Sequence, residues 1–187
     1  MGHGGPWAKP TDQGGAEAPL AARIPRQPDT QAAWLTFEAA LADVLPLLDE
    51  DEYLIIGTKR RPYYVQFAGE GHHGMRVEAV SNAFIDEPAD QLNDAQHERL
   101  GALGWDGPAE IVPRPDAPPG TSAQGNFFVD VAAPVPVAQV AELACATLRQ
   151  VYGVAHPGEL AYRAFHGRGD GIRFPTLHLL RVARFED

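Results

Sequence analysis

Two six-residue stretches decide the fold of this chain: Tyr63-Tyr64-Val65-Gln66-Phe67-Ala68 and Met75-Arg76-Val77-Glu78-Ala79-Val80. In the first stretch Tyr63, Val65 and Phe67 alternate with Tyr64, Gln66 and Ala68, and in the second Met75, Val77 and Ala79 alternate with Arg76, Glu78 and Val80. Successive side chains of a β-strand point to opposite faces of the sheet, so each set would share one face. The pattern therefore predicts two strands, each with one face inward and one outward. The turn between them, residues 69–74, is short and rich in glycine, which favours an antiparallel hairpin.

Two further strands are expected on either side of this pair. Tyr53 to Ile56 is short and apolar, as a central strand would be, and the short turn 57–62 connects it to the next strand. Asn126 to Val131 predicts a fourth strand with three apolar side chains on one face: Phe127, Val129 and Val131.

Three segments carry the spacing of helices. The first begins near Asp29 or Thr30 as N-cap, and Pro46 should kink or tighten its last turn. The second begins at Asn93, whose side chain can form a capping box with Gln96, and ends at Gly104. The third is the clearest, because a continuous apolar stripe runs along it: Val137, Val140, Ala141, Ala144, Leu148, Val151 and Tyr152.

The end of the chain is predicted to hold a short helix over Glu159 to Phe165 and an alternating segment over Thr176 to Phe185. The element order is then α-β-β-β-α-β-α with an optional last strand. Sequential strands joined by short turns make an antiparallel sheet the expected arrangement, and helices must cover its apolar face. The sequence therefore predicts an α+β fold with an antiparallel sheet of about four to five strands packed on helices in two layers.

The domain organisation follows from composition. Residues 1–28 are rich in glycine and proline with few apolar residues, so we expect a disordered tail. We expect residues 29–187 to form a single α+β domain, with the proline-rich stretch 107–125 as a long loop within it.

Charge and composition exclude several classes of partner. The formal net charge of −10 opposes non-specific binding to nucleic acid or to an anionic membrane, both of which require a basic surface. No apolar run approaches the ~18 residues of a membrane helix, and no secretory signal is recognisable. A single cysteine excludes an internal disulfide framework. We therefore expect a cytoplasmic protein.

The sequence offers no recognised catalytic or metal-binding motif. Phosphate loops, zinc-protease helices and nucleophile elbows are all absent. His72 and His73 lie together on a turn, but nothing nearby supplies the three or four ligands that zinc requires. Cys145 is interpreted as a small buried thiol in the third helix, and Lys59-Arg60-Arg61 as a basic cluster that keeps a hairpin turn soluble. We predict no catalytic residues, no metal site and no cofactor.

One face of the predicted sheet combines aromatic and charged side chains, the types that often anchor protein partners. We refer to the following six residues as the polar patch, and we predict that they bind peptide: Tyr64, Gln66, Arg76, Glu78, Phe128 and Asp130. The alternative is that the last part of the chain or another helix covers this face.

Six short segments resemble the YbjN-like and type III secretion chaperone-like superfamily, in particular its actinobacterial peptide-binding chaperone branch. They consist mainly of core and turn residues between about 29 and 165: Trp34-Leu35-Thr36-Phe37-Glu38, Tyr63 to Ala68, Met75 to Asn82, Leu103-Gly104-Trp105, Asn126-Phe127-Phe128 and Leu148 to Val154. The resemblance implies a small acidic α+β protein, often dimeric, that holds segments of client proteins. The loop 107–125 and the tail depart from the minimal pattern.

The function predicted from these observations is a non-enzymatic cytoplasmic chaperone-like or adaptor module that binds a peptide segment of a client protein. Apolar pockets on the sheet, with a client strand added at an edge, would supply the affinity. Two alternatives stay open. One is a small-molecule enzyme with a site at the sheet edge that uses Glu78, Asp130 or the histidines. The other is a structural subunit that self-associates, for which a homodimer is the simplest assembly.

Overall fold

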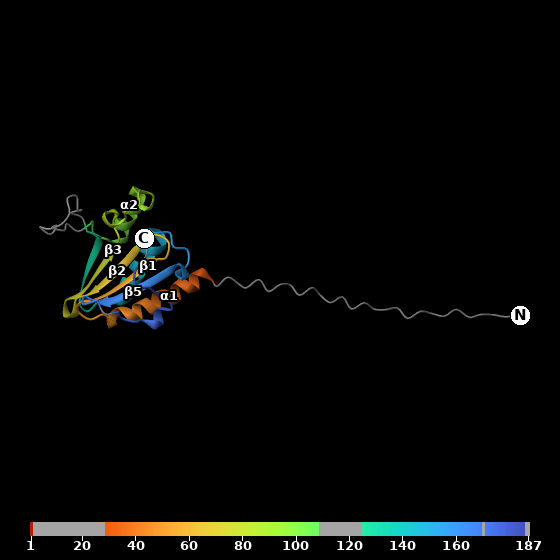
Figure 1. The fold of residues 1–187 in the computed structure, drawn as a ribbon, viewed down its shortest axis with the longest axis horizontal. Helices are drawn as coiled ribbons and strands as arrows, with labels where there is room; N and C mark the ends of the chain where they lie inside the picture. The colour runs from red at the N-terminus through yellow and green to blue at the C-terminus, as the bar shows by residue number, and fades with distance from the viewer. Residues whose placement is uncertain (2–28, 109–124, 170, 186–187) are drawn as a thin grey trace.

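The structure is a computed structural model that describes Met1 and residues 29–108, 125–169 and 171–185 (Figure 1). The predictions for the tail 1–28 and for most of the loop 107–125 lie outside the described residues. The longer elements, in chain order, are α1 (Thr30–Val44), β1 (Glu52–Thr58), β2 (Tyr64–Gly69), β3 (Gly74–Ala79), α2 (Asp94–Leu103), β4 (Phe127–Ala132), α3 (Val137–Gln150), β5 (Leu160–His166) and β6 (Leu180–Arg181). Short 3₁₀ turns join several of them.

The helix boundaries follow the capping residues closely. The Asp29 side chain accepts a hydrogen bond from the amide of Gln31, 3.0 Å away, and so caps α1. A 3₁₀ turn that contains Pro46 follows α1, because proline cannot donate the next helical hydrogen bond. At α2 the complete Asn93–Gln96 capping box is present, and the helix ends at Gly104 with a left-handed φ of 100°.

Four antiparallel pairings and one parallel pairing build one sheet with the strand order β4-β3-β2-β1-β5-β6. The meander β1-β2-β3 and its continuation to β4 are antiparallel, as predicted. In the registers, Phe67 stands opposite both Leu54 and Val77, and Val77 stands opposite Val129. The apolar members of the alternation therefore share one face across four strands.

Residues 160–166 correct one expectation. The predicted short helix over Glu159 to Phe165 is wrong, because this segment forms β5, which pairs with β1 along its whole length. Its alternation explains the result: Tyr162 and Ala164 pair with Ile56 and Leu54 and join the core. The sheet consequently has six strands rather than four or five, while the α+β class and the two layers are as predicted.

Residues 171–185 form less regular structure than the alternation suggested. A 3₁₀ turn, Pro175–Leu177, packs beside α1, and only Leu180 and Arg181 form a strand, β6. This strand is parallel to β5. The preceding turn is anchored, since Phe174 and Leu177 are both buried in the core.

The core lies between the sheet and the helices α1 and α3. Trp34, Phe37 and Leu41 of α1 and Ala141, Ala144 and Leu148 of α3 are buried with the inward side chains of the strands, and Figure 1 shows α1 alongside the sheet. We call the opposite side of the sheet the open face. Within the described residues, no helix combines the length and apolar character that a membrane span needs.

Candidate functional site

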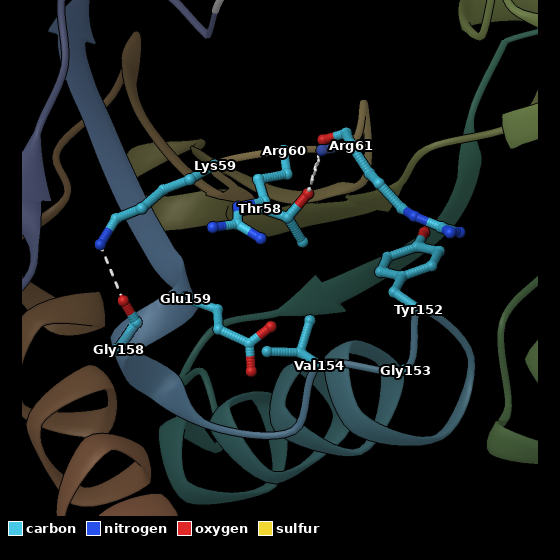
Figure 2. A pocket seen from close by; sticks show the side chains of 9 residues that line it. All are labelled: Thr58, Lys59, Arg60, Arg61, Tyr152, Gly153, Val154, Gly158 and Glu159. Carbon is cyan, nitrogen blue, oxygen red and sulfur yellow. Dashed lines mark hydrogen bonds between the residues drawn. The ribbon is translucent and has the colours of Figure 1, made fainter.

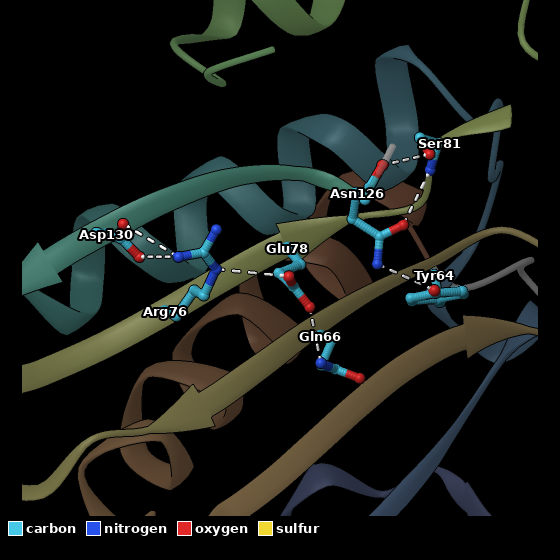
Figure 3. A network of polar contacts seen from close by, with 8 residues as sticks. Tyr64, Gln66, Arg76, Glu78, Ser81, Asn126 and Asp130 are labelled. Atoms are coloured by element: carbon cyan, nitrogen blue, oxygen red, sulfur yellow. Dashed lines mark hydrogen bonds and ion pairs between the residues drawn. The ribbon is translucent and has the colours of Figure 1, made fainter. Parts of the chain in front are cut away.

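The register brings all six residues of the polar patch onto the open face. Gln66 of β2 stands opposite Glu78 of β3, and Glu78 stands opposite Phe128 of β4. Arg76 pairs in the same way with Asp130. Figure 3 shows the side chains of Gln66, Arg76, Glu78 and Asp130 on one side of the strands, with helices behind the sheet.

Arg76 is the centre of a polar network on this face. Its Nη1 donates to both carboxylate oxygens of Asp130, at 3.0 and 3.2 Å, and its Nε lies 3.5 Å from Oε1 of Glu78. The other Glu78 oxygen accepts a hydrogen bond from Nε2 of Gln66 at 2.8 Å. The guanidinium carbon also lies 4.2 Å from the ring centroid of Phe128, a cation–π distance. One cation thus orients two carboxylates and an aromatic ring.

Tyr64 is held at the end of this network by residues that the sequence prediction did not include. Asn126 Nδ2 donates to the Tyr64 hydroxyl at 3.1 Å, and Asn126 Oδ1 accepts from the amide of Ser81. The Ser81 hydroxyl donates to the carbonyl of Gly125 at 2.7 Å. Burial raises the pKa of Tyr64 above its ordinary value, while the bond from Asn126 lowers it. Tyr64 therefore keeps its proton at neutral pH and retains a donor.

The middle of the patch is accessible from solvent. The side chains of Arg76, Glu78 and Asp130 are 30%, 21% and 56% exposed. The helices α1 and α3 pack on the other face of the sheet. In the last described segment, residues 171–185, the Phe185 ring lies on the open face against Gly57 of β1.

The open face continues beyond the predicted patch onto β1 and β5. Tyr53 and Phe165 stack with their ring centroids 5.3 Å apart, and the Arg163 guanidinium lies 4.2 Å from the Phe165 ring. The face therefore carries two arginine–aromatic pairs, one on each half. Sequence reasoning missed the second pair because it assigned residues 159–165 to a helix, although their two-residue alternation was the available signal.

A cavity of about 620 Å³ lies beside the β1–β2 turn, between this turn and the segment that follows α3 (Figure 2). The basic cluster Lys59-Arg60-Arg61 lines one side, and Tyr152, Val154 and Glu159 are among the residues opposite. Lys59 Nζ donates to the carbonyl of Gly158 at 2.7 Å, and its backbone amide donates to Glu159. Lys59 therefore fastens the turn to the start of β5, a structural role that adds to the solubility role predicted from sequence.

The other titratable candidates do not converge on a reactive centre. Burial raises the pKa of Cys145 from 9.0 to about 12, with a smaller contribution from Glu38, so the thiol stays protonated at neutral pH. His72 and His73 are exposed on their turn. Among the described residues, no three His, Cys, Asp or Glu side chains are grouped so as to hold a metal ion.

Comparison with known proteins gives one result. Residues 27–166, about three quarters of the chain, match the model of a family described as T3SS (YopN, CesT) and YbjN peptide-binding chaperone 3, or TY-Chap3. No curated protein and no solved structure shows a significant match to the chain. The match includes α1, α2, α3 and β1 to β5, and it ends before the segment that contains β6.

Proposed function

Because the chain belongs to the TY-Chap3 family of peptide-binding chaperones, we propose that it holds an extended segment of a client protein against the polar patch on its open face. Family membership points to a non-enzymatic, chaperone-like role. The proposal adds where on this chain the client binds and which side chains anchor it.

The arrangement around Arg76 is the observation that carries this proposal. Arginine and aromatic side chains dominate the binding energy of many interfaces because they bury large areas and still offer directed polar contacts. Here Arg76 is already fixed by Asp130 and Glu78 and lies over Phe128, so a client would meet a preorganised surface. Preorganisation lowers the entropy lost when a peptide binds.

We propose that the client lies on the face of the sheet rather than along the outer edge of β4. At that edge Asp106 exchanges two backbone hydrogen bonds with Phe128, at 3.0 and 3.4 Å, and so occupies the position where an added strand would begin. Phe128 is half-buried and the charged groups of Arg76, Glu78 and Asp130 beside it are partly exposed, so this surface is open to a ligand from above the sheet. Tyr64 and Gln66 extend the same surface toward β1.

The charge balance of the patch supports binding over acid–base catalysis. Glu78 and Asp130 both contact Arg76, which balances their charge and holds them in place. A general acid and base need environments that separate their proton affinities and a cleft that admits substrate. An ion-paired, open surface fits recognition of a peptide with polar and apolar side chains better.

The experiment that tests this function is affinity capture of the tagged full chain with two single substitutions, Tyr64→Asp and Phe128→Asp. Each places a charge where we expect a client side chain to pack, so stoichiometric partners found by mass spectrometry should be lost. Leu35→Asp is the matched control, because Leu35 is exposed on α1. Circular dichroism and urea unfolding must show that each variant is folded.

The outcomes separate the candidate functions. Loss of a client with either patch substitution, but not with Leu35→Asp, supports the proposal. Partners that survive both patch substitutions would contradict it. If the main captured species is a second copy of this chain and the mass in sedimentation rises with concentration, self-association is the better explanation.

A further inference from the structure

The outer edge of β5 is closed by residues that lie outside the family match. The amide of Ile172 donates to the carbonyl of Ala164, and the amide of Val182 donates to the carbonyl of Tyr162, both at 2.9 Å. Leu180 and Arg181 pair in parallel with Ala161 and Tyr162. A segment beyond residue 166 therefore satisfies backbone groups that an edge strand would otherwise offer to a partner.

The same segment then reaches the open face. A Cβ atom built on Gly57 would lie 2.8 and 2.9 Å from two ring carbons of Phe185, so the ring rests directly on the β1 backbone. Gly57 stands opposite Tyr64 on one side and Ala161 on the other. The two small residues Gly57 and Ala161 thus leave a flat surface for one aromatic side chain, next to the polar patch. We call this surface the Gly57 floor.

Residues 180–185 fill this position incompletely. The strand pairing with β5 is limited to Leu180 and Arg181, with one further hydrogen bond from Val182, and Leu180 is 60% exposed. A cavity of about 630 Å³ remains between the segment and the sheet, lined by Thr58, Lys59, Ala161, Leu180 and residues 182–185. By contrast, Phe174 and Leu177, which precede the segment, are buried. The chain is therefore anchored in the core through Leu179, which packs against it, and its side chains are more exposed from Leu180 onward.

We propose that the β5 edge and the Gly57 floor form a second peptide-binding subsite, and that residues 180–185 occupy it within the same chain as a replaceable ligand. The class of external ligand is an extended peptide whose backbone pairs with Tyr162 and whose aromatic side chain covers Gly57. This inference rests on the proposed peptide-binding function and extends it from the polar patch to the β1–β5 half of the open face.

An attached ligand competes through its effective concentration. For short tethers this concentration is in the millimolar range. If the segment, as a free peptide, binds the subsite with a dissociation constant of about 100 µM, any external peptide would bind the full chain about tenfold more weakly than a chain without the segment. A client that contacts both the polar patch and this subsite could displace the segment.

The test uses the segment itself as the probe. A fluorescent hexapeptide with the sequence of residues 180–185, Leu-Arg-Val-Ala-Arg-Phe, is titrated by anisotropy into the full chain and into a chain that lacks residues 180–187. The deletion retains Phe174 and Leu177, and circular dichroism checks its fold. We expect binding to the truncated chain and about tenfold weaker binding to the full chain, with no binding of a scrambled peptide. Equal affinities for the two chains, or equal binding of the scrambled peptide, would overturn the proposal.

A double-substitution cycle locates the aromatic position. In the truncated chain, Gly57→Ala should weaken the hexapeptide about as much as replacing the peptide phenylalanine by alanine, and the two changes together should cost no more than one. Gly101→Ala is the matched control, because a Cβ there would meet no atom within 4 Å. Additive effects would place the phenylalanine elsewhere and contradict the assignment.

A full-length variant keeps the test decisive if the truncated chain does not fold. Phe185→Ala removes the ring from Gly57 and should bind the hexapeptide more tightly than the unchanged full chain; an unchanged affinity would count against the proposal.

The failure of this inference can be told apart from a failure of the proposed function. Client capture that depends on Phe128, together with a hexapeptide that binds no variant, would overturn this inference alone.

Discussion

The two faces of the same sheet differ in what they present, although they are made from alternate residues of the same strands. On β3, Met75, Val77 and Ala79 are buried beneath the helices, whereas Arg76 and Glu78 between them are partly exposed and joined to β2 and β4 by polar contacts. The closed face determines the fold through packing. Because the side chains of Arg76 and Glu78 are partly exposed, we expect the open face to contribute less to stability.

The largest expected difference between the faces is in stability. Phe67→Ala removes a fully buried ring and should lower the free energy of unfolding by about 3–5 kcal/mol. Gln66→Ala, one residue away on the open face, loses one partly exposed hydrogen bond and should cost about 1 kcal/mol or less. Urea denaturation of both variants measures the contrast. Similar losses would show that the open face is also part of the core.

A second test concerns solvent access on the closed side. With a pKa of about 12 instead of 9.0, the Cys145 thiol has about a thousandfold less thiolate at pH 8 in the folded chain than in the unfolded chain. Disulfide-exchange labelling should therefore be slowed by at least that factor under native conditions. Rapid native labelling would contradict burial of this helix interface.

The same thiol predicts the direction of a pH effect. Its pKa is raised on folding, so its contribution to stability is complete below pH 9 and is lost as the pH rises toward 12. Replacing Cys145 by alanine should reduce the loss of stability between pH 8 and pH 11. An identical pH dependence in the two proteins would contradict this assignment.

A smaller effect is expected at the centre of the polar patch. Arg76→Met leaves Glu78 and Asp130 without their shared cation and should lower stability by about 1 kcal/mol or less, because the pairs are partly exposed. The difference should shrink in 1 M salt, where the Debye length is about 3 Å. Urea denaturation at low and high salt checks this, and a loss that does not depend on salt would indicate a packing role instead.

The smallest effect is predicted for the basic turn. Arg60 is exposed and has no hydrogen bond or ion pair with any described residue, so Arg60→Ala should change stability by no more than about 0.5 kcal/mol. Lys59→Ala should cost more, since it removes the bond to Gly158. Equal effects in thermal unfolding would show that the Lys59 bond does not stabilise the turn.

Much of the fold could be predicted from sequence because local chemistry determined it. The Asn93–Gln96 capping box and Gly104 set both ends of α2, and alternation in β2 and β3 placed Arg76 and Glu78 on the face opposite the core. Residues 159–165 were misassigned because a short apolar run fits either a helix or a strand, and only pairing with β1 decides between them.

The position of a site residue could be predicted from sequence only where it follows from the alternation of side chains along a strand. The open-face positions of the six patch residues follow from alternation. The hydrogen bond from Asn126 to Tyr64 and the contact of Phe185 with Gly57 join residues more than 60 positions apart, so no local pattern indicates them. Such contacts are fixed by tertiary packing.

The most direct test is to determine which of the two faces of the sheet binds a peptide. A peptide selected by display against the full chain is titrated into the isotopically labelled protein, and chemical shifts are followed by NMR. We expect saturable changes at Tyr64, Gln66 and Phe128, with little change on the outward side of α1. Saturable changes confined to α1 and α3, with the open face unaffected, would contradict this expectation.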